Sequence, residues 1–218
     1  VSDPKTINAT QNKRSLLKNM KGCDSVLTLY LSVNLDKTFF ENISAGHFFY
    51  TPSRKGQSLA GTPPYQGTWE EVEGWLERFF ALTTYEISIP VLRESSLAPE
   101  GKTGLIISAL FDYQITKYIS DMGWDERFRQ RVGNLMINTL ENSVYPGLGN
   151  SILDRFMSTP LSIQRMTGNT DGAITGWSFT NHPMPAESRL VRIANSVKTP
   201  LPDAVSYTHL TLPTNREV

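Results

Sequence analysis

The sequence predicts an α+β fold (mixed α/β), in which one mixed sheet packs against a helical layer. Residues 27–33 alternate apolar and polar side chains, which is the period of a half-buried strand. Residues 68–83 and 125–140 repeat apolar side chains at helical spacing. The near-continuous apolar run 105–113, "LIISALFDY", predicts a central strand buried on both faces.

Local signals place the elements in the first half of the chain. Residues 46–52, "GHFFYTP", predict a short strand, and the Gly-, Pro- and Ser-rich stretch 53–67 predicts a loop. Thr68 has Glu71 three residues on, which is the capping-box arrangement that begins a helix. Residues 85–91 return to a period of two. Because the proline within this run lacks an N–H donor, we expect an edge or a bulge there.

The second half predicts one long helical block. Asp125 is expected to cap the longest helix, and "YPGLGN" at 145–150 ends it. Residues 151–158, "SILDRFMS", predict one or two further helical turns. Pro160 ends this block, and 161–168 then predict a strand-like run.

Composition bounds the function. At 218 residues the chain is long enough for one large domain or two small ones. Lys and Arg balance Asp and Glu at 21 each, so net charge gives no case for a nucleic-acid partner. Cys23 is the one cysteine, which rules out an internal disulfide and suits a reducing, cytoplasmic compartment. No apolar stretch reaches the roughly 18 residues of a spanning helix.

The sequence holds no self-sufficient catalytic motif. A nucleophile elbow, a P-loop, an H-E-x-x-H helix and a Cys/His cluster at metal spacing are all absent from it. His47 and His182 are isolated, and His209 stands near the C-terminal end. We therefore predict no metal site and leave the catalytic residues unassigned.

Two sequence features each allow a structural and a functional interpretation. Aromatic side chains gather between residues 39 and 85, where they either form core or line an apolar tunnel for a substrate. The block 158–179, "STPLSIQRMTGNTDGAITGWSF", is rich in glycine near its end. Its glycines either let backbone approach a ligand closely or serve an ordinary turn at "NTDG".

The same block, followed by "SVKTPLP", resembles the C-terminal part of the phytoene desaturase, carotenoid isomerase and retinol saturase group of flavoproteins. In that group a "(S/T)PLT…R/Y-Tx-N-x-x-GA-x-x-G" pattern precedes "KTPIPGLYLAG". The opening "VSDPKT" is similar to the point at which the group's chain leaves its nucleotide-binding domain. "GHFFYTP" and "SLAPEGKTGLIISALFDY" resemble its substrate-domain strands, so the likeness runs in order over about residues 1–204.

The resemblance implies an FAD-dependent oxidoreductase that desaturates, saturates or isomerises an apolar polyene-type substrate, with the cofactor supplying the chemistry. The residues expected nearest the flavin or the substrate end are Gly168, Gly172, Ala173, Gly176 and Trp177. The aromatic residues expected to contact the substrate are Phe48, Tyr50, Phe79 and Phe80. Arg165 is either a charge near the flavin or half of a surface ion pair. A peripheral membrane contact suits a polyene substrate, although no Lys/Arg-rich amphipathic helix supports one.

The pattern also predicts the organisation of the chain. The group's Gly-rich nucleotide-binding domain and its C-terminal flavin-contacting stretch are not in this sequence. We expect 1–22 to be a link from that domain, 23–195 the substrate-binding domain and 196–204 the start of the return. Residues 205–218 resemble a translated sequencing-library adapter, and we expect them to be non-native. The chain would then be a fragment that is inactive alone. The alternative is a stand-alone module that binds a hydrophobic ligand without redox activity.

Overall fold

The structure, a computed structural model, describes residues 11, 15, 18–178, 180 and 181. The chain divides into two units, of which one is Gly22–Gly176 and the other combines 1–21 with 177–218. All the strands and helices given below belong to Gly22–Gly176. The expected return segment 196–204, the expected adapter-encoded tail 205–218, His182 and His209 lie outside the described residues.

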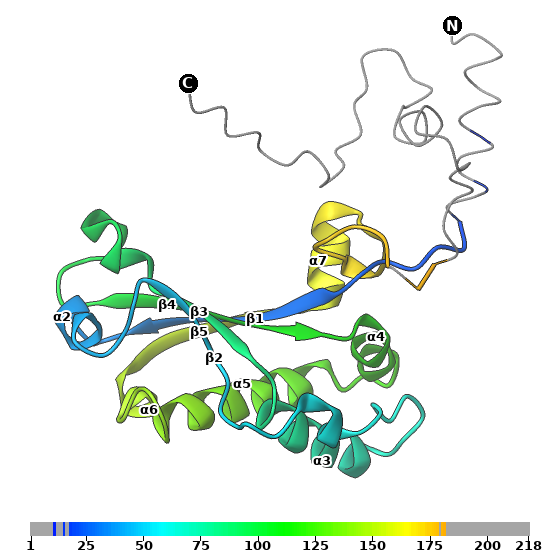
Figure 1. The fold of residues 1–218 in the computed structure, drawn as a ribbon, viewed down its shortest axis with the longest axis horizontal. Helices are drawn as coiled ribbons and strands as arrows, with labels where there is room; N and C mark the ends of the chain where they lie inside the picture. Colours follow the sequence, from blue (N-terminus) through cyan, green and yellow to red (C-terminus); the bar gives the residue numbers. More distant parts are fainter. Residues whose placement is uncertain (1–10, 12–14, 16–17, 179, 182–218) are drawn as a thin grey trace, which may run out of the picture. The chain divides into compact units, whose positions relative to one another are not determined.

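Five strands form one sheet in the order β2-β3-β4-β1-β5 (Figure 1). Their bounds are β1 Ser25–Val33, β2 His47–Tyr50, β3 Tyr85–Ser88, β4 Thr103–Phe111 and β5 Ile152–Ser158. Every pairing in this sheet is antiparallel, so the predicted mixed sheet is wrong in that respect, while the α+β class is confirmed. The run at 105–113 does give the central strand, β4.

Helices lie on both sides of the sheet, but unequally. Their bounds are α2 Lys37–Glu41, α3 Trp69–Phe80, α4 Tyr113–Asp121, α5 Asp125–Glu141, α6 Leu148–Ser151 and α7 Pro160–Thr167. Short 3-10 turns occupy Gln57–Ala60, Pro90–Leu92, Ser95–Leu97 and Thr170–Gly172. In Figure 1, α3, α5 and α6 lie on one side of the sheet and α7 lies on the other.

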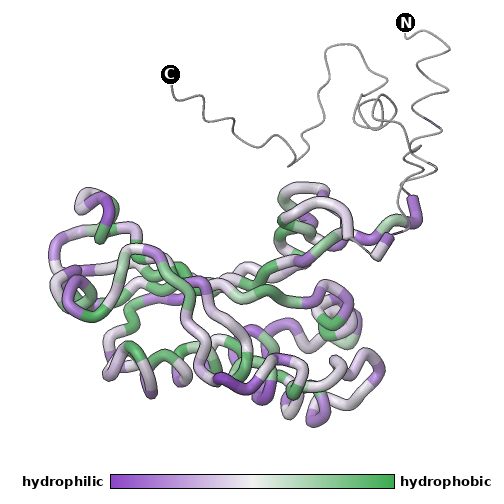
Figure 2. Tube along the Cα trace, viewed as in Figure 1, coloured by the Kyte–Doolittle hydropathy of each residue, from purple (hydrophilic) through white to green (hydrophobic). Residues whose placement is uncertain are grey.

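Helix α3 begins where its sequence predicts. The Thr68 N–H donates to Glu71 Oε2 at 2.7 Å, and the Glu71 N–H donates to Thr68 Oγ1 at 3.4 Å, so the capping box is confirmed. Its buried face includes Val72 and Leu76, and polar residues occupy the opposite face. Figure 2 shows the same mixture of polar and apolar positions along α3 and α5. Such amphipathic helices bury one stripe against a sheet.

Charged side chains join α3 to α5. Arg131 on α5 has its Nε 2.8 Å from Glu73 Oε1, and its guanidinium also contacts Glu77. The Arg127 guanidinium lies 4.5 Å from the ring centroid of Trp69, a cation–π distance. The helical layer is therefore held by polar contacts at its surface as well as by its core.

Two elements have the opposite secondary structure to the prediction. Residues 152–158 form strand β5 instead of helical turns. Residues 160–167 form helix α7 instead of a strand. Thr159 is the N-cap of α7, with its Oγ1 accepting from the Ser162 N–H, and Pro160 is the first helical residue, where a missing N–H carries no penalty.

Three finer predictions also need correction. Asp125 is the first residue of α5 and not its cap: Trp124 precedes the helix, and the Asp125 carboxylate accepts from Ser120 Oγ. Strand β3 ends at Ser88, so Pro90 lies in the following 3-10 turn and not in a strand. Strand β4 is buried on one face only, because Leu110 is 53% exposed.

Candidate functional site

The alternation of strands β1 and β4 divides the sheet into two different faces. Leu29 lies opposite Ile107 on the face that packs against the helices, and both side chains are buried. Tyr30 lies opposite Ile106 on the other face. We call this second surface the open face, and it consists of Val26, Thr28, Tyr30, Ser32, His47, Phe49, Glu86, Ser88, Gly104, Ile106, Ser108, Leu110, Asp154, Phe156 and Ser158.

Large apolar side chains are exposed on the open face. Phe49 and Phe156 are 67% and 63% exposed, and Leu110 is 53% exposed. The Tyr30 and Phe156 rings pack against each other with centroids 5.7 Å apart. Clustered exposed apolar side chains on one surface are typical of a binding site, whereas single ones are ordinary.

Polar groups on the open face form a band across the strands. The hydroxyls of Thr28 and Ser108 hydrogen bond at 2.9 Å, and Glu86 lies opposite Ser108. His47 Nε2 lies 2.8 Å from Glu86 Oε1 at the β2 side of the sheet. Ionisable groups therefore lie toward both edges, with His47 and Glu86 at one and Asp154 on β5 at the other, and the centre carries hydroxyls and apolar side chains.

The glycine-rich block forms a fixed turn after α7. Gly168 ends the helix in the left-handed region at φ 74°. Gly172 has φ 60°, and a Cβ there would lie 2.2 Å from the Pro160 carbonyl oxygen. Asp171 adopts φ 55° while its Oδ2 accepts from the Gly22 N–H at 2.9 Å. The turn therefore needs glycine at 172 for packing and conformation alike.

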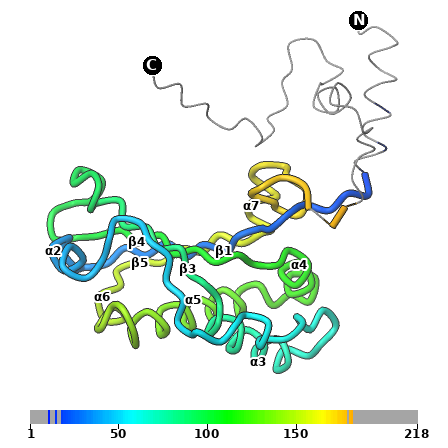
Figure 3. The backbone as a smooth tube through the Cα atoms, in the orientation of Figure 1, coloured from blue at the N-terminus to red at the C-terminus, as the bar shows by residue number. Residues whose placement is uncertain are grey.

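Beyond this turn the chain returns to the start of β1, as Figure 3 shows. Ile174 N–H donates to the Asp24 carbonyl at 3.0 Å, and Cys23 N–H donates to the Gly176 carbonyl at 2.8 Å. Ala173 is buried, whereas a Cβ at Gly168 or Gly176 would meet nothing within 4 Å. The turn interpretation thus accounts for Gly172 and Ala173, and flavin contact by any of these residues stays a prediction.

The remaining two residues of this block, Arg165 and Trp177, have exposed side chains. Arg165 is exposed in the last turn of α7, and no ion pair involves it within the described part of the chain. Trp177 is 43% exposed and belongs to the other unit.

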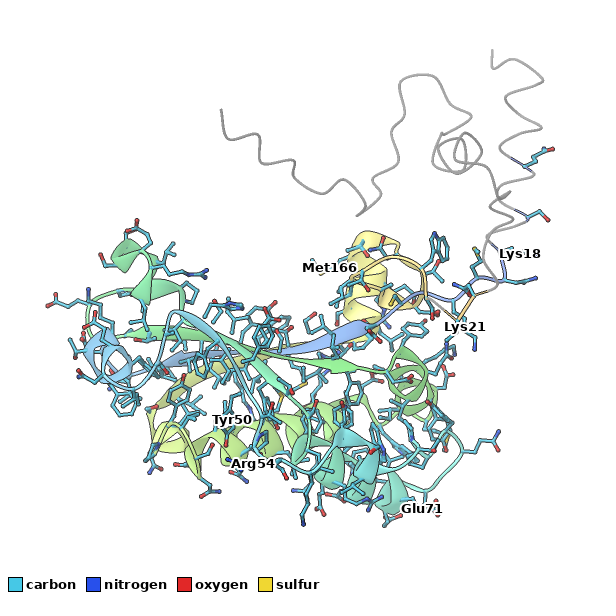
Figure 4. All side chains as sticks on the ribbon, viewed as in Figure 1. Lys18, Lys21, Tyr50, Arg54, Glu71 and Met166 are labelled. Carbon is cyan, nitrogen blue, oxygen red and sulfur yellow. The ribbon has the colours of Figure 1, made fainter. Side chains whose placement is uncertain are left out.

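The four aromatic residues predicted to contact a substrate lie on the helix side of the sheet. Phe79 and Phe80 are buried against Phe111, with ring centroids 5.3 and 5.9 Å from it. Phe48 and Tyr50 are half-buried against the same core. Figure 4 shows Tyr50 on this side and Met166, on α7, on the opposite side. The core interpretation explains all four, and their contact with a substrate stays a prediction.

Sequence reasoning missed the open face because it followed only the buried half of each strand. The even-numbered residues of β1 and β4 include Tyr30, Ile106 and Leu110, which are apolar where a solvated face would be polar. These apolar residues at positions expected to be polar could have indicated a binding surface. Phe156 carried no such signal, because its segment was assigned to a helix.

Comparison with known proteins found no match, either among protein-family models or among curated proteins. No three His, Cys, Asp or Glu side chains converge as a metal site in the part of the chain that the structure describes. Over the same residues, no helix has both the length and the apolar character needed to cross a membrane.

Proposed function

We propose that Gly22–Gly176 is the substrate-binding part of an FAD-dependent oxidoreductase, and that an apolar polyene-type substrate lies across the open face. The observation that carries this proposal is the exposure of Tyr30, Leu110 and Phe156 on one face of the sheet. Burying such side chains against an apolar ligand is favourable by about 25 cal/mol per Å². The resemblance of the block at 158–179 supplies the reaction class.

The residues present fit only a part of the cofactor. Gly168 and Gly176 have open space beside their Cα atoms, which would allow a planar ring to approach the backbone closely. In the described residues, no glycine-rich turn leads from a strand into a helix that could hold the pyrophosphate. This unit would therefore orient the substrate and exclude water, while FAD, held elsewhere, supplies the hydride chemistry.

Retinol binding by the full chain tests the apolar part of the proposal. We expect saturable binding of all-trans-retinol, followed by its fluorescence, and roughly tenfold weaker binding by Phe156→Asp. The matched control is Leu59→Asp, because Leu59 is also 63% exposed but lies in the loop before α3. No binding by the wild-type chain, or equal weakening by both substitutions, would contradict the proposal.

Flavin binding separates the enzyme from a stand-alone apolar-ligand module. We expect the chain by itself to bind FAD weakly, because no pyrophosphate site is found among its described residues. We expect the reading frame extended into the adjoining genomic DNA to give a protein with a flavin absorbance spectrum. An extended protein that binds retinol and lacks flavin would favour the stand-alone module.

A further inference from the structure

A pocket of about 320 Å³ lies between strand β5 and helix α5. Leu29 on β1 and Met157 on β5 supply apolar wall, and Phe156 borders the pocket from the edge strand. The rest of the lining consists of Glu126, Arg129, Gln130, Gly133 and Arg155. This volume is near the lower end of the range for ligand pockets, about 300–1,000 Å³, so the pocket suits a small molecule.

Helix α5 lines the pocket with a single face. Glu126, Arg129, Gln130 and Gly133 stand at the i, i+3, i+4 and i+7 positions, which share one side of a helix. A Cβ at Gly133 would lie 3.5 Å from Arg155 Nη1, an ordinary contact distance. Packing would therefore allow alanine at 133, although alanine is the better helix former. Glycine at this position leaves the floor of the pocket open.

Two arginines are held at the pocket by contacts that cross it. Arg129 on α5 donates from Nη1 to the Met157 carbonyl oxygen on β5 at 2.8 Å. Arg155 on β5 donates from Nη1 to Asn134 Oδ1 on α5 at 2.7 Å. Both acceptors are neutral, and neither arginine forms an ion pair within the described part of the chain. Because a guanidinium has five N–H donors, most of them stay available to a ligand.

The formal charges of the lining indicate the charge of that ligand. Arg129 and Arg155 carry +1 each, and the Glu126 carboxylate, which accepts from Gln130 Nε2 at 2.7 Å, carries −1, so the sum is +1. A single carboxylate balances this charge. A phosphate ester brings about −1.5 to −2 and would place excess negative charge beside Glu126. Guanidinium groups also match a planar carboxylate with two parallel hydrogen bonds.

We infer that this pocket binds a small organic carboxylate with an apolar body. The carboxylate contacts Arg129 and Arg155, the apolar body packs against Leu29 and Met157, and Gly133 leaves room for it. This site goes beyond the function proposed above and does not depend on it, because its ligand lies between β5 and α5 and needs neither a flavin nor a polyene.

Probes of one size and different charge test the inference. The full chain is titrated in a calorimeter with phenylacetate and with phenylacetamide, its neutral counterpart. We expect saturable phenylacetate binding with a Kd of about 1 mM or tighter. Phenylacetamide should bind at least about tenfold more weakly, because it cannot form charged hydrogen bonds with the arginines. No phenylacetate binding, or equal binding of the two probes, would show that the site is wrong.

The choice of carboxylate over phosphate has a test of its own. Phenyl phosphate should bind more weakly than phenylacetate, and Glu126→Gln should tighten the binding of both by removing a like charge. Tighter binding of phenyl phosphate by the wild-type chain would overturn the assignment to a carboxylate.

Arginine variants locate the binding. Arg129→Gln should weaken phenylacetate binding at least about tenfold. The matched control is Arg78→Gln, because Arg78 also donates to a backbone carbonyl, that of Ala60, but lies on α3 outside the pocket. The control should stay within about twofold of the wild-type affinity. If Arg129→Gln does not fold, Arg155→Gln provides the same comparison, and an unchanged affinity in the variant that folds would overturn the site.

Gly133→Ala separates binding from stability. Its methyl group should fill the floor of the pocket and weaken phenylacetate binding at least about threefold. The midpoint of urea unfolding should stay the same or rise, because alanine favours a helix and meets no close contact at this position. Wild-type affinity in Gly133→Ala would show that phenylacetate binds elsewhere on the chain.

Discussion

The two faces of the sheet carry similar side chains in opposite surroundings. Phe111 is 3% exposed and packs against Phe79, Phe80 and Phe128, whereas its neighbour Leu110 is 53% exposed. On the helix side, apolar groups find partners within the unit. On the open face they find few among the described residues. We therefore expect stability to depend mainly on the helix side of the sheet, so that substitutions on the open face cost the fold little.

The adjacent pair at the end of β4 gives the largest expected contrast. Phe111→Ala should lower the free energy of unfolding by about 3–5 kcal/mol, because it leaves a cavity among packed rings. Leu110→Ala should change it by no more than about 0.5 kcal/mol. Urea unfolding measures both. Similar losses at the two positions would show that the open face is buried in the folded chain.

In the turn after α7, substitution of Gly172 should destabilise the fold more than substitution of Gly168. Gly172→Ala should cost at least about 2 kcal/mol, because its Cβ would overlap the Pro160 carbonyl at 2.2 Å and its φ is positive. Gly168→Ala should cost about 1 kcal/mol, because only its positive φ of 74° opposes a side chain. Thermal unfolding compares the two. Equal losses would mean that the close contact at Gly172 relaxes freely.

Two tyrosine hydroxyls sharpen the contrast between the faces. The Tyr85 hydroxyl on the helix side is buried and donates to the Phe80 carbonyl at 2.6 Å, so Tyr85→Phe should cost about 1 kcal/mol at neutral pH. Tyr30→Phe, on the open face, should cost almost nothing, because the Tyr30 side chain is 39% exposed.

Burial raises the pKa of Tyr85, which adds a pH dependence to the same comparison. The folded state keeps the proton that the unfolded state releases near pH 10, so this stability is complete below pH 10 and is lost as the pH rises. Relative to Tyr85→Phe, the wild-type chain should lose up to about 1.4 kcal/mol per pH unit above 10. Parallel curves for the two proteins in urea unfolding at pH 9–11 would argue against a buried hydroxyl.

The smallest expected contrast lies between two polar contacts, one on each face of the sheet. Arg131→Met removes the contacts with Glu73 and Glu77 that join α3 to α5, and should cost about 0.5–1 kcal/mol. Glu86→Gln on the open face should change the free energy of unfolding by no more than about 0.5 kcal/mol, because the pair with His47 is half exposed. The loss at Arg131 should shrink in high salt, and salt independence would point to packing of its stem instead.

The elements that were predicted correctly from the sequence are those in which a local motif, such as a helix cap, agrees with the pattern of buried residues. The capping box at Thr68 and the alternation from Leu27 to Val33 are of this kind. The segment 152–158 was predicted as helix because its sequence does not alternate apolar and polar residues. It lacks this alternation because β5 is an edge strand with few buried positions. The segment 160–167 was predicted wrongly because Pro160 was interpreted as the end of a helix. Thr159 and Ser162 form a capping box, so Pro160 instead begins helix α7.

The site was harder to predict than the fold for a physical reason. Aromatic side chains are common in cores, and Phe79 and Phe80 follow the helical period that puts them there. The residues of the open face come from five strands and meet only through strand register, which a single sequence does not display. The glycine-rich block could be predicted as a turn from its sequence. The structure shows why glycine is needed there, because a Cβ at Gly172 would overlap the Pro160 carbonyl oxygen.

The hydrogen bond from Cys23 to Gly176 joins the place where the chain enters this unit to the place where it leaves. A unit whose two connections are neighbours can be inserted into a loop of a host protein without separating the host's own residues. We therefore expect that Gly22–Gly176 can be inserted as a domain into another protein. Grafted between two adjacent surface residues of an unrelated carrier, it should fold there and carry its open face with it.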